Sequence, residues 1–132
     1  MKDYTVITDL EERLSSPGFS NEVEDGRSLP QFSYYTCVCG QPIRFEWRHL
    51  QEAGTGPHTE LTESEAREIA EVARAQVQPH DDFLDFHCPK CKNPVRLYFR
   101  TWAGGRHGDA GADWRFIVEG RSESPTTPPT VR

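Results

Sequence analysis

Two tight pairs of cysteines are the residues of this chain whose types and spacing could do chemistry. Cys37 and Cys39 are separated by one residue, and Cys88 and Cys91 are separated by two. Four thiolates that meet from two turns form a closed tetrahedral zinc site. Zinc suits four thiolates best, and iron is an alternative metal for the same ligands. Four protein ligands leave no open position for water, so we expect one structural Zn²⁺ rather than a catalytic ion.

A histidine in place of one thiol is the main alternative ligand set, and His87 lies next to Cys88. The other histidines are scattered, and four thiols already saturate zinc. Whether the closely spaced Cys37 and Cys39 both supply ligands stays open at this point. Disulfides are a further alternative, but a bridge between Cys37 and Cys39 would close a strained ring.

The amino terminus lacks an apolar signal segment, and no stretch approaches the length of a membrane span. We therefore expect a cytoplasmic protein with no membrane partner, in a compartment where paired cysteines are usually metal ligands. Apolar residues make up only 35% of the 132 residues, which predicts a small core. A metal bound only by the folded chain would stabilise such a core.

The formal net charge of −6 is unevenly spread. Residues 1–87 carry seven basic and 17 acidic side chains, whereas residues 88–121 carry seven basic and three acidic ones. The first balance, −10, favours a basic partner, because complementary charges accelerate association. The acidic side chains considered for this role are Glu22, Glu24, Asp25, Glu63, Glu65, Glu68 and Glu71.

The first cysteine pair is expected at the tip of a β-hairpin. Residues 32–36 predict a strand that leads into the pair, and Ile43, Phe45 and Trp47 then alternate with charged residues. A period of two indicates a strand with one buried face. Gly40 tolerates the left-handed backbone that a turn of this kind needs.

The second cysteine pair is expected at the tip of a similar hairpin, with strands at 83–87 and 95–102 and a return strand at 114–118. Asn93 is the residue after this pair that best tolerates a left-handed backbone. Between the hairpins, a helix is predicted at about 62–78. Thr62 and Glu65 have capping-box spacing at its start, and apolar residues follow at helical spacing.

The two motifs with their flanking strands resemble zinc ribbons of the rubredoxin-like kind, over residues 32–48 and 83–118. A usual knuckle has two residues between its cysteines, and the first knuckle here has one. The resemblance implies an α+β fold, in which a small antiparallel sheet of two zinc-knuckle hairpins carries one inserted helix.

The predicted organisation follows from these elements. We expect an acidic N-terminal segment over 1–31 and a zinc-ribbon-like domain over 32–121, with the inserted helix at about 62–78. The tail over 122–132 is rich in Pro, Ser and Thr, which predicts disorder.

The strand after the second cysteine pair offers a candidate partner-binding surface. Its apolar positions are expected to face the core, and these are Val95, Leu97 and Phe99. The opposite face is expected to carry the partner-binding residues, which are Arg96, Tyr98, Arg100 and Trp102, with Arg115 from the return strand. Arginine and aromatic side chains together are typical of protein interfaces and of surfaces that stack single-stranded nucleic acid.

No nucleophile–base pair or phosphate-binding glycine motif stands out, so we predict no catalytic residues and no enzyme. The leading hypothesis is a zinc-stabilised module that binds a protein partner, for example an inhibitor or immunity protein that binds a basic toxin. One alternative is a zinc ribbon that binds nucleic acid. Another is a redox-sensing zinc switch, because the order Cys-x-Cys then Cys-x-x-Cys resembles the zinc centre of the redox-regulated bacterial heat-shock chaperone.

Overall fold

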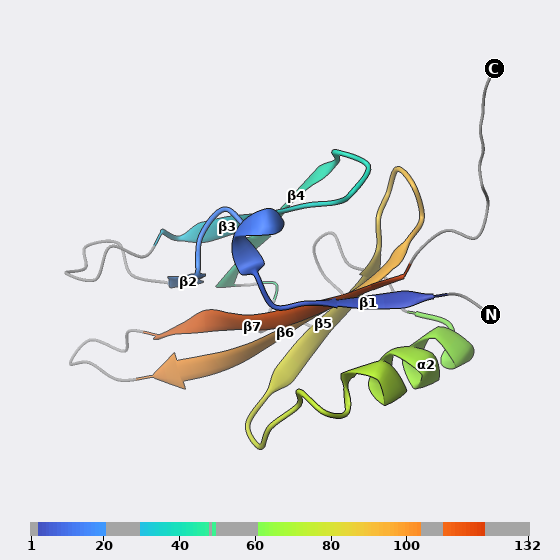
Figure 1. Cartoon of the computed structure of the whole chain (residues 1–132). Helices are drawn as coiled ribbons and strands as arrows, with labels where there is room; N and C mark the ends of the chain where they lie inside the picture. The colour runs from blue at the N-terminus through green and yellow to red at the C-terminus, as the bar shows by residue number, and fades with distance from the viewer. Residues whose placement is uncertain (1–2, 21–29, 48, 50–60, 104–109, 121–132) are drawn as a thin grey trace.

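The computed structural model describes residues 3–20, 30–47, 49, 61–103 and 110–120. They form mostly antiparallel strands in two sheets together with a helix, which confirms the predicted α+β class (Figure 1). The larger sheet has five strands: β1 (Tyr4–Ile7), β2 (Gly18–Ser20), β5 (Asp82–His87), β6 (Pro94–Ala103) and β7 (Ala110–Gly120).

The smaller sheet is a hairpin of β3 (Phe32–Thr36) and β4 (Pro42–Glu46). A short 3₁₀-helix, η1 (Leu10–Glu12), lies between β1 and β2 in the chain, and the α-helix α2 (Glu63–Ala73) lies between β4 and β5. No described helix combines the length and apolar character that crossing a membrane requires.

Strand β7 organises the larger sheet, whose order is β1-β7-β6-β5, with β2 also paired to β7. Tyr4 lies opposite Gly120 at one end of β7, and Gly18 lies opposite Asp113 nearer the other end. The strand is longer than the predicted 114–118 because β6 pairs along one of its edges and both β1 and β2 pair along the other.

Two cores cover the two faces of this sheet (Figure 1). On one face, Tyr35 and Phe45 of the β3–β4 hairpin pack against Phe86 of β5. On the other face, Ile69 and Ala73 of α2 lie in a second cluster with three residues of the sheet, Tyr98, Phe116 and Val118. The β3–β4 hairpin and the helix therefore lie on different sides of β6 and β7.

Helix α2 begins as predicted and ends earlier. Thr62 caps it, and the reciprocal hydrogen bonds with Glu65 form a complete capping box. The helix ends at Ala73, not near residue 78, and the backbone N–H groups of Gln76 and Val77 both donate to the Ala73 carbonyl. The chain then turns so that the Asp81 carboxylate accepts the Gln78 N–H at 2.8 Å.

The N-terminal segment contributes β1 and β2 to the same sheet as β5, β6 and β7. The predicted domain division at residue 31 stays a prediction, as does the predicted disorder of residues 122–132, which lie outside the described residues. Glu22, Glu24 and Asp25 also lie outside the described part of the chain.

Candidate metal centre

The turn between β3 and β4 carries Cys37 and Cys39. The Cys37 N–H donates to the Gln41 carbonyl at 2.9 Å, and the Gly40 N–H donates to the Cys37 carbonyl at 2.7 Å. Gly40 has a φ of 94°, in the left-handed region where a glycine pays no Cβ penalty. This turn directs both thiols of the closely spaced pair into one cluster, despite the single residue between them.

The turn between β5 and β6 repeats this backbone pattern around Cys88 and Cys91. The Cys88 N–H donates to the Asn93 carbonyl and the Lys92 N–H donates to the Cys88 carbonyl, both at 2.9 Å. Lys92, with a φ of 68°, takes the left-handed position that the sequence analysis assigned to Asn93. The reason is positional, because Lys92 directly follows the second cysteine of its pair, as Gly40 does in the first turn.

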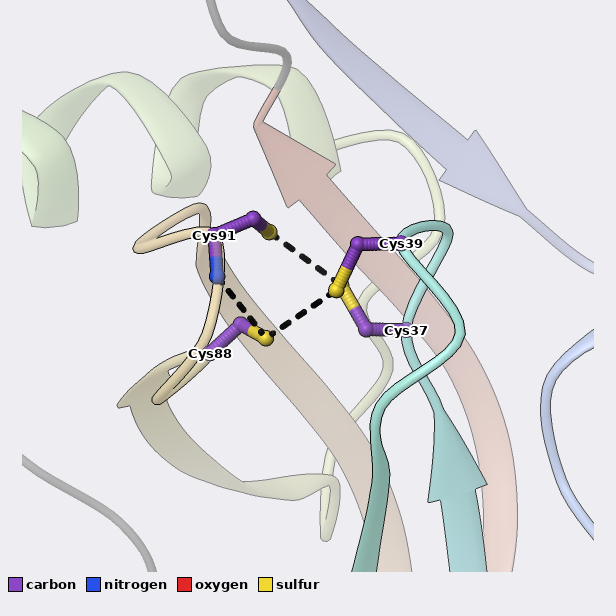
Figure 2. A group of neighbouring side chains, drawn as sticks. All are labelled: Cys37, Cys39, Cys88 and Cys91. Atoms are coloured by element: carbon purple, nitrogen blue, oxygen red, sulfur yellow. Dashed lines mark hydrogen bonds between the residues drawn. The ribbon is translucent and has the colours of Figure 1, made fainter.

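The four thiols converge from the two turns (Figure 2). All four Sγ atoms lie within 4.8 Å of one another. The Sγ atoms of Cys37 and Cys91 are 3.5 Å apart, and those of Cys39 and Cys88 are 3.6 Å apart. Both of these approaches run between the two hairpins.

Aromatic packing below the cluster holds the hairpins in this position. Phe86 lies two residues before Cys88, and Tyr35 lies two residues before Cys37. The Phe86 ring is 5.5 Å from the Tyr35 ring and 5.4 Å from the Phe45 ring, measured between centroids. Fully buried rings of this size position the two tips through a large shared contact area.

Each hairpin supplies one deeply buried thiol and one that is closer to the surface. Cys37 and Cys88 are 3% and 0% exposed, whereas Cys39 and Cys91 are partly buried. Burial raises the pKa of Cys37 and of Cys91, because a thiolate is costly away from water. Cys37 and Cys91 are therefore poor thiolates unless a cation compensates their charge.

Cys88 differs from the other buried thiol. Burial alone would raise its pKa, but the N–H groups of Cys91 and Lys90 point at its Sγ, at 3.5 and 3.4 Å. Together with hydrogen bonds from neighbouring thiols, they lower the pKa of Cys88 to about 7. The backbone of this turn therefore stabilises negative charge on the Cys88 sulfur even without a metal ion.

The donor set fits one metal ion. Four clustered sulfur atoms could hold a single ion, and zinc is a plausible one, since tetrahedral sulfur sites are typical of zinc and of iron–sulfur proteins. Comparisons of the chain with models of protein families, with curated proteins and with solved structures found no match. The zinc-ribbon resemblance therefore stays a prediction from the motifs.

Two of the histidines that the structure describes, His49 and His87, have other neighbours. The Nε2 atom of His87 lies 2.8 Å from the Glu65 carboxylate, and the Nδ1 atom of His49 accepts the Glu46 N–H at 3.0 Å. His58 and His107 lie outside the described residues. The group of metal-ligating side chains assembled by the described residues consists of the four cysteines.

The predicted partner-binding face of β6 is not an open surface. Val95, Leu97 and Phe99 face the core, as predicted. Arg96 and Tyr98, on the opposite face, are only 5% and 3% exposed.

The Nε and Nη2 groups of Arg96 donate to the two carboxylate oxygens of Asp85, at 2.7 and 3.0 Å. The Arg96 Cζ also lies 3.7 Å from the centroid of the Phe83 ring. The Tyr98 ring stacks on Phe116 in the cluster beneath α2. Intramolecular partners therefore cover Arg96 and Tyr98, whereas the partner-binding role of this face as a whole stays a prediction.

Arg100 and Arg115 converge on Asp81 instead of on solvent. Their Nε atoms lie 2.9 and 3.0 Å from the Asp81 Oδ1, and the Asp81 side chain is 0% exposed. Burial opposes its charge, but hydrogen bonds from Arg115, the Gln78 N–H and Arg100 lower the pKa of Asp81 to about 2. Trp102 is partly buried over Gly111, where a Cβ would lie 2.4 Å from its ring.

Three of the acidic side chains considered for a basic partner have intramolecular contacts. Glu65 is only 8% exposed and belongs to the capping box of α2, and the Glu68 carboxylate accepts the Tyr4 hydroxyl at 2.9 Å. Glu63 and Glu71 are exposed on the surface of the helix, and the Glu71 carboxylate forms an exposed ion pair with Arg74 at 2.5 Å.

Sequence reasoning missed a polar network and a pocket beside the cysteines. The buried Glu119 carboxylate binds Arg13 at 2.6 and 3.2 Å and accepts the Tyr35 hydroxyl. Arg13 and Glu119 are separated by 106 residues, so no local pattern could pair them. Both line a pocket of about 510 Å³ that also reaches Cys39 and Cys91.

Proposed function

We propose that this chain is a protein-binding module stabilised by one structural Zn²⁺, with Cys37, Cys39, Cys88 and Cys91 as its ligands. The convergence of four Sγ atoms within 4.8 Å of one another carries this proposal. Cys37 and Cys88 are buried beside an aromatic core, where thiolate charge needs a compensating cation, and a bound metal ion would supply it.

The ion acts as a cross-link between the two sheets. Cys37 and Cys39 extend from the smaller sheet, and Cys88 and Cys91 extend from the larger one. A complete set of four sulfur ligands gives the metal no open position, so its contribution is to stability. Zinc is favoured over iron as the resident metal because it needs no redox partner and suits this donor set.

The partner is proposed to be a basic protein, for which an inhibitor or immunity role is one concrete form. The support is the balance of −10 over residues 1–87, together with the exposed acids Glu63 and Glu71 on α2. Nucleic acid is ranked lower, since the Arg96 and Tyr98 face that would stack bases is buried. We propose no catalytic residue, and the cytoplasmic location stays a prediction.

Elemental analysis of the purified protein tests the metal. We expect one zinc per chain, and we expect Cys37→Ser and Cys88→Ser to lose zinc and cooperative melting. Lys90→Ser is the matched control. It also introduces a serine into the second turn, at an exposed position between Cys88 and Cys91, but it removes no ligand. Metal-free protein whose melting is unchanged by the cysteine substitutions would contradict the proposal.

Affinity capture in the presence of increasing salt tests the partner. The expected captured protein is basic, and its retention falls with salt and with the double substitution Glu63→Lys and Glu71→Lys. Glu65 and Glu68 are left unchanged because their contacts support the fold. Retention that is insensitive to both salt and charge reversal would argue against an electrostatically matched partner.

A further inference from the structure

The pocket beside the metal centre joins both hairpins to the end of β7. One cysteine from each hairpin lines the pocket. These two residues, Cys39 and Cys91, carry the less buried thiols of the cluster. Val38, Arg13, Glu119 and Thr5 are among its other lining residues. A group that enters this pocket would therefore meet the outer side of the metal centre.

The charge of the pocket is negative once the ion is bound. Four thiolates around a divalent ion carry a net charge of −2. Arg13 adds no net positive charge, because it forms a two-armed ion pair with Glu119. The cations of the neighbouring turn, Lys90 and Lys92, are not among the residues that line the pocket.

The pocket also has an apolar rim. Val38 lies between the two cysteines of the first turn and is 64% exposed, the largest exposed fraction among the exposed large apolar side chains described. A negatively charged recess beside an exposed aliphatic side chain suits a long cationic side chain, whose stem packs on the rim while its charged end enters.

We propose that this pocket receives an arginine side chain from a basic segment of the partner protein, an inference that rests on the proposed metal-bound thiolates. The guanidinium donates N–H groups toward the Sγ atoms of Cys39 and Cys91, and the aliphatic stem packs against Val38. Charge-assisted hydrogen bonds are roughly twice as strong as neutral ones, which favours a guanidinium over an uncharged donor. A flat guanidinium with several donors can also reach both sulfurs at once.

The probe for this proposal is N-acetyl-arginine amide, titrated into the isotope-labelled, zinc-loaded full chain and followed by NMR. We expect saturable shifts of the amide signals of residues that line the pocket, which include Val38, Cys39, Cys91 and Gly120. N-acetyl-citrulline amide, which has the same shape without the charge, should leave these signals in place. Inorganic phosphate should also leave them in place.

Two substitutions of the same type provide the variant and its control. Val38→Lys puts a positive charge at the rim and should weaken arginine binding at least about tenfold. Val72→Lys makes the same change at an exposed position of α2 and should bind as the unmodified chain does. Both variants change exposed side chains, so retained zinc and melting temperature are expected and are measured in the same samples.

Each outcome separates this inference from the proposed function. If the protein binds one zinc per chain, three results would overturn the arginine pocket and leave the metal site standing. These are equal shifts from the citrulline probe, shifts from phosphate, and equal effects of the two lysine variants. Protein that binds no stoichiometric metal would overturn both.

Discussion

Gly40 and Lys92 show how a single backbone angle matters in the two turns that carry the cysteines. Each residue directly follows the second cysteine of its pair, and each has a positive φ, 94° and 68° respectively. A lysine at such an angle is strained, whereas a glycine is not. The two turns therefore use the same geometry with different conformational costs.

This difference predicts opposite responses to substitution. A Cβ at Gly40 would meet nothing within 4 Å, so Gly40→Ala costs only backbone strain, about 1–2 kcal/mol of unfolding free energy. Lys92→Gly relieves strain of about 1–2 kcal/mol but gives the unfolded chain conformational freedom that costs about 0.5–1 kcal/mol, so we expect a gain of up to about 1 kcal/mol in unfolding free energy. Urea denaturation of the zinc-loaded variants measures both, and equal losses would contradict the shared geometry.

Asp81 is a further residue whose charge affects the stability of the folded chain. Its carboxylate is buried between Arg100 and Arg115 and has a pKa of about 2, below the unfolded value of about 3.9. The pair of arginines therefore stabilises the folded state above pH 4, and this contribution is lost as the pH falls from about 4 toward 2.

Replacing this carboxylate should be costly. We expect Asp81→Asn to lower the unfolding free energy at pH 7 by about 2 kcal/mol, and the gap to the unmodified chain to narrow as the pH falls below 4. Asp82→Asn, at the exposed neighbouring position, should cost less than about 0.5 kcal/mol. A gap that is independent of pH would show that the charge of Asp81 is not the cause.

At the level of elements, the start of α2 joins helix formation to the second hairpin. The Thr62 hydroxyl accepts the Glu65 N–H at 3.1 Å, and the Glu65 carboxylate accepts the Thr62 N–H at 2.9 Å. The same carboxylate lies 2.8 Å from His87, the residue before Cys88. The capping box thus positions the helix and contacts the strand that leads to the metal centre.

Loss of the cap should weaken the helix without removing the metal. We expect Thr62→Ala to lower the unfolding free energy by about 1 kcal/mol, because the Glu65 N–H loses its acceptor. Thr62→Ser keeps a hydroxyl in place and should cost much less. Chemical denaturation compares the variants at equal zinc content, and equal losses from both substitutions would contradict the capping role.

At the level of the whole molecule, metal binding should be linked to protons. Burial raises the pKa of Cys37 and Cys91, so both thiols are protonated near pH 7 in the metal-free fold and must lose their protons to bind zinc. We expect zinc binding at pH 7 to release at least about two protons, and zinc affinity to fall as the pH falls.

Calorimetric titration in buffers with different ionisation enthalpies measures this release. The slope of the apparent enthalpy against the buffer enthalpy counts the protons directly. The Cys37→Ser variant is the natural comparison, since it lacks one titrating ligand. Zinc binding without proton release would show that the four sulfurs are not the ligands.

Local patterns in the sequence were sufficient for the strands of both cysteine hairpins, for the start of α2 and for the clustered cysteines, but they predicted neither β1 nor β2 nor the end of the helix. Alternation in residues 43–47 predicted β4, the Thr62–Glu65 spacing predicted the start of α2, and paired cysteines at hairpin tips predicted the cluster. Each of these signals acts over a few residues, because backbone hydrogen bonds and side-chain periodicity are local.

Tertiary structure alone decided what covers each face and which distant charges meet. Periodicity placed Arg96 and Tyr98 opposite the core, but only packing with Asp85 and Phe116 showed that this face is a second interior. Likewise, the ion pair of Arg13 and Glu119 joins residues 106 positions apart. A side-chain pattern indicates that one face of an element can be buried. Which other element covers that face depends on the free energy of packing the whole chain.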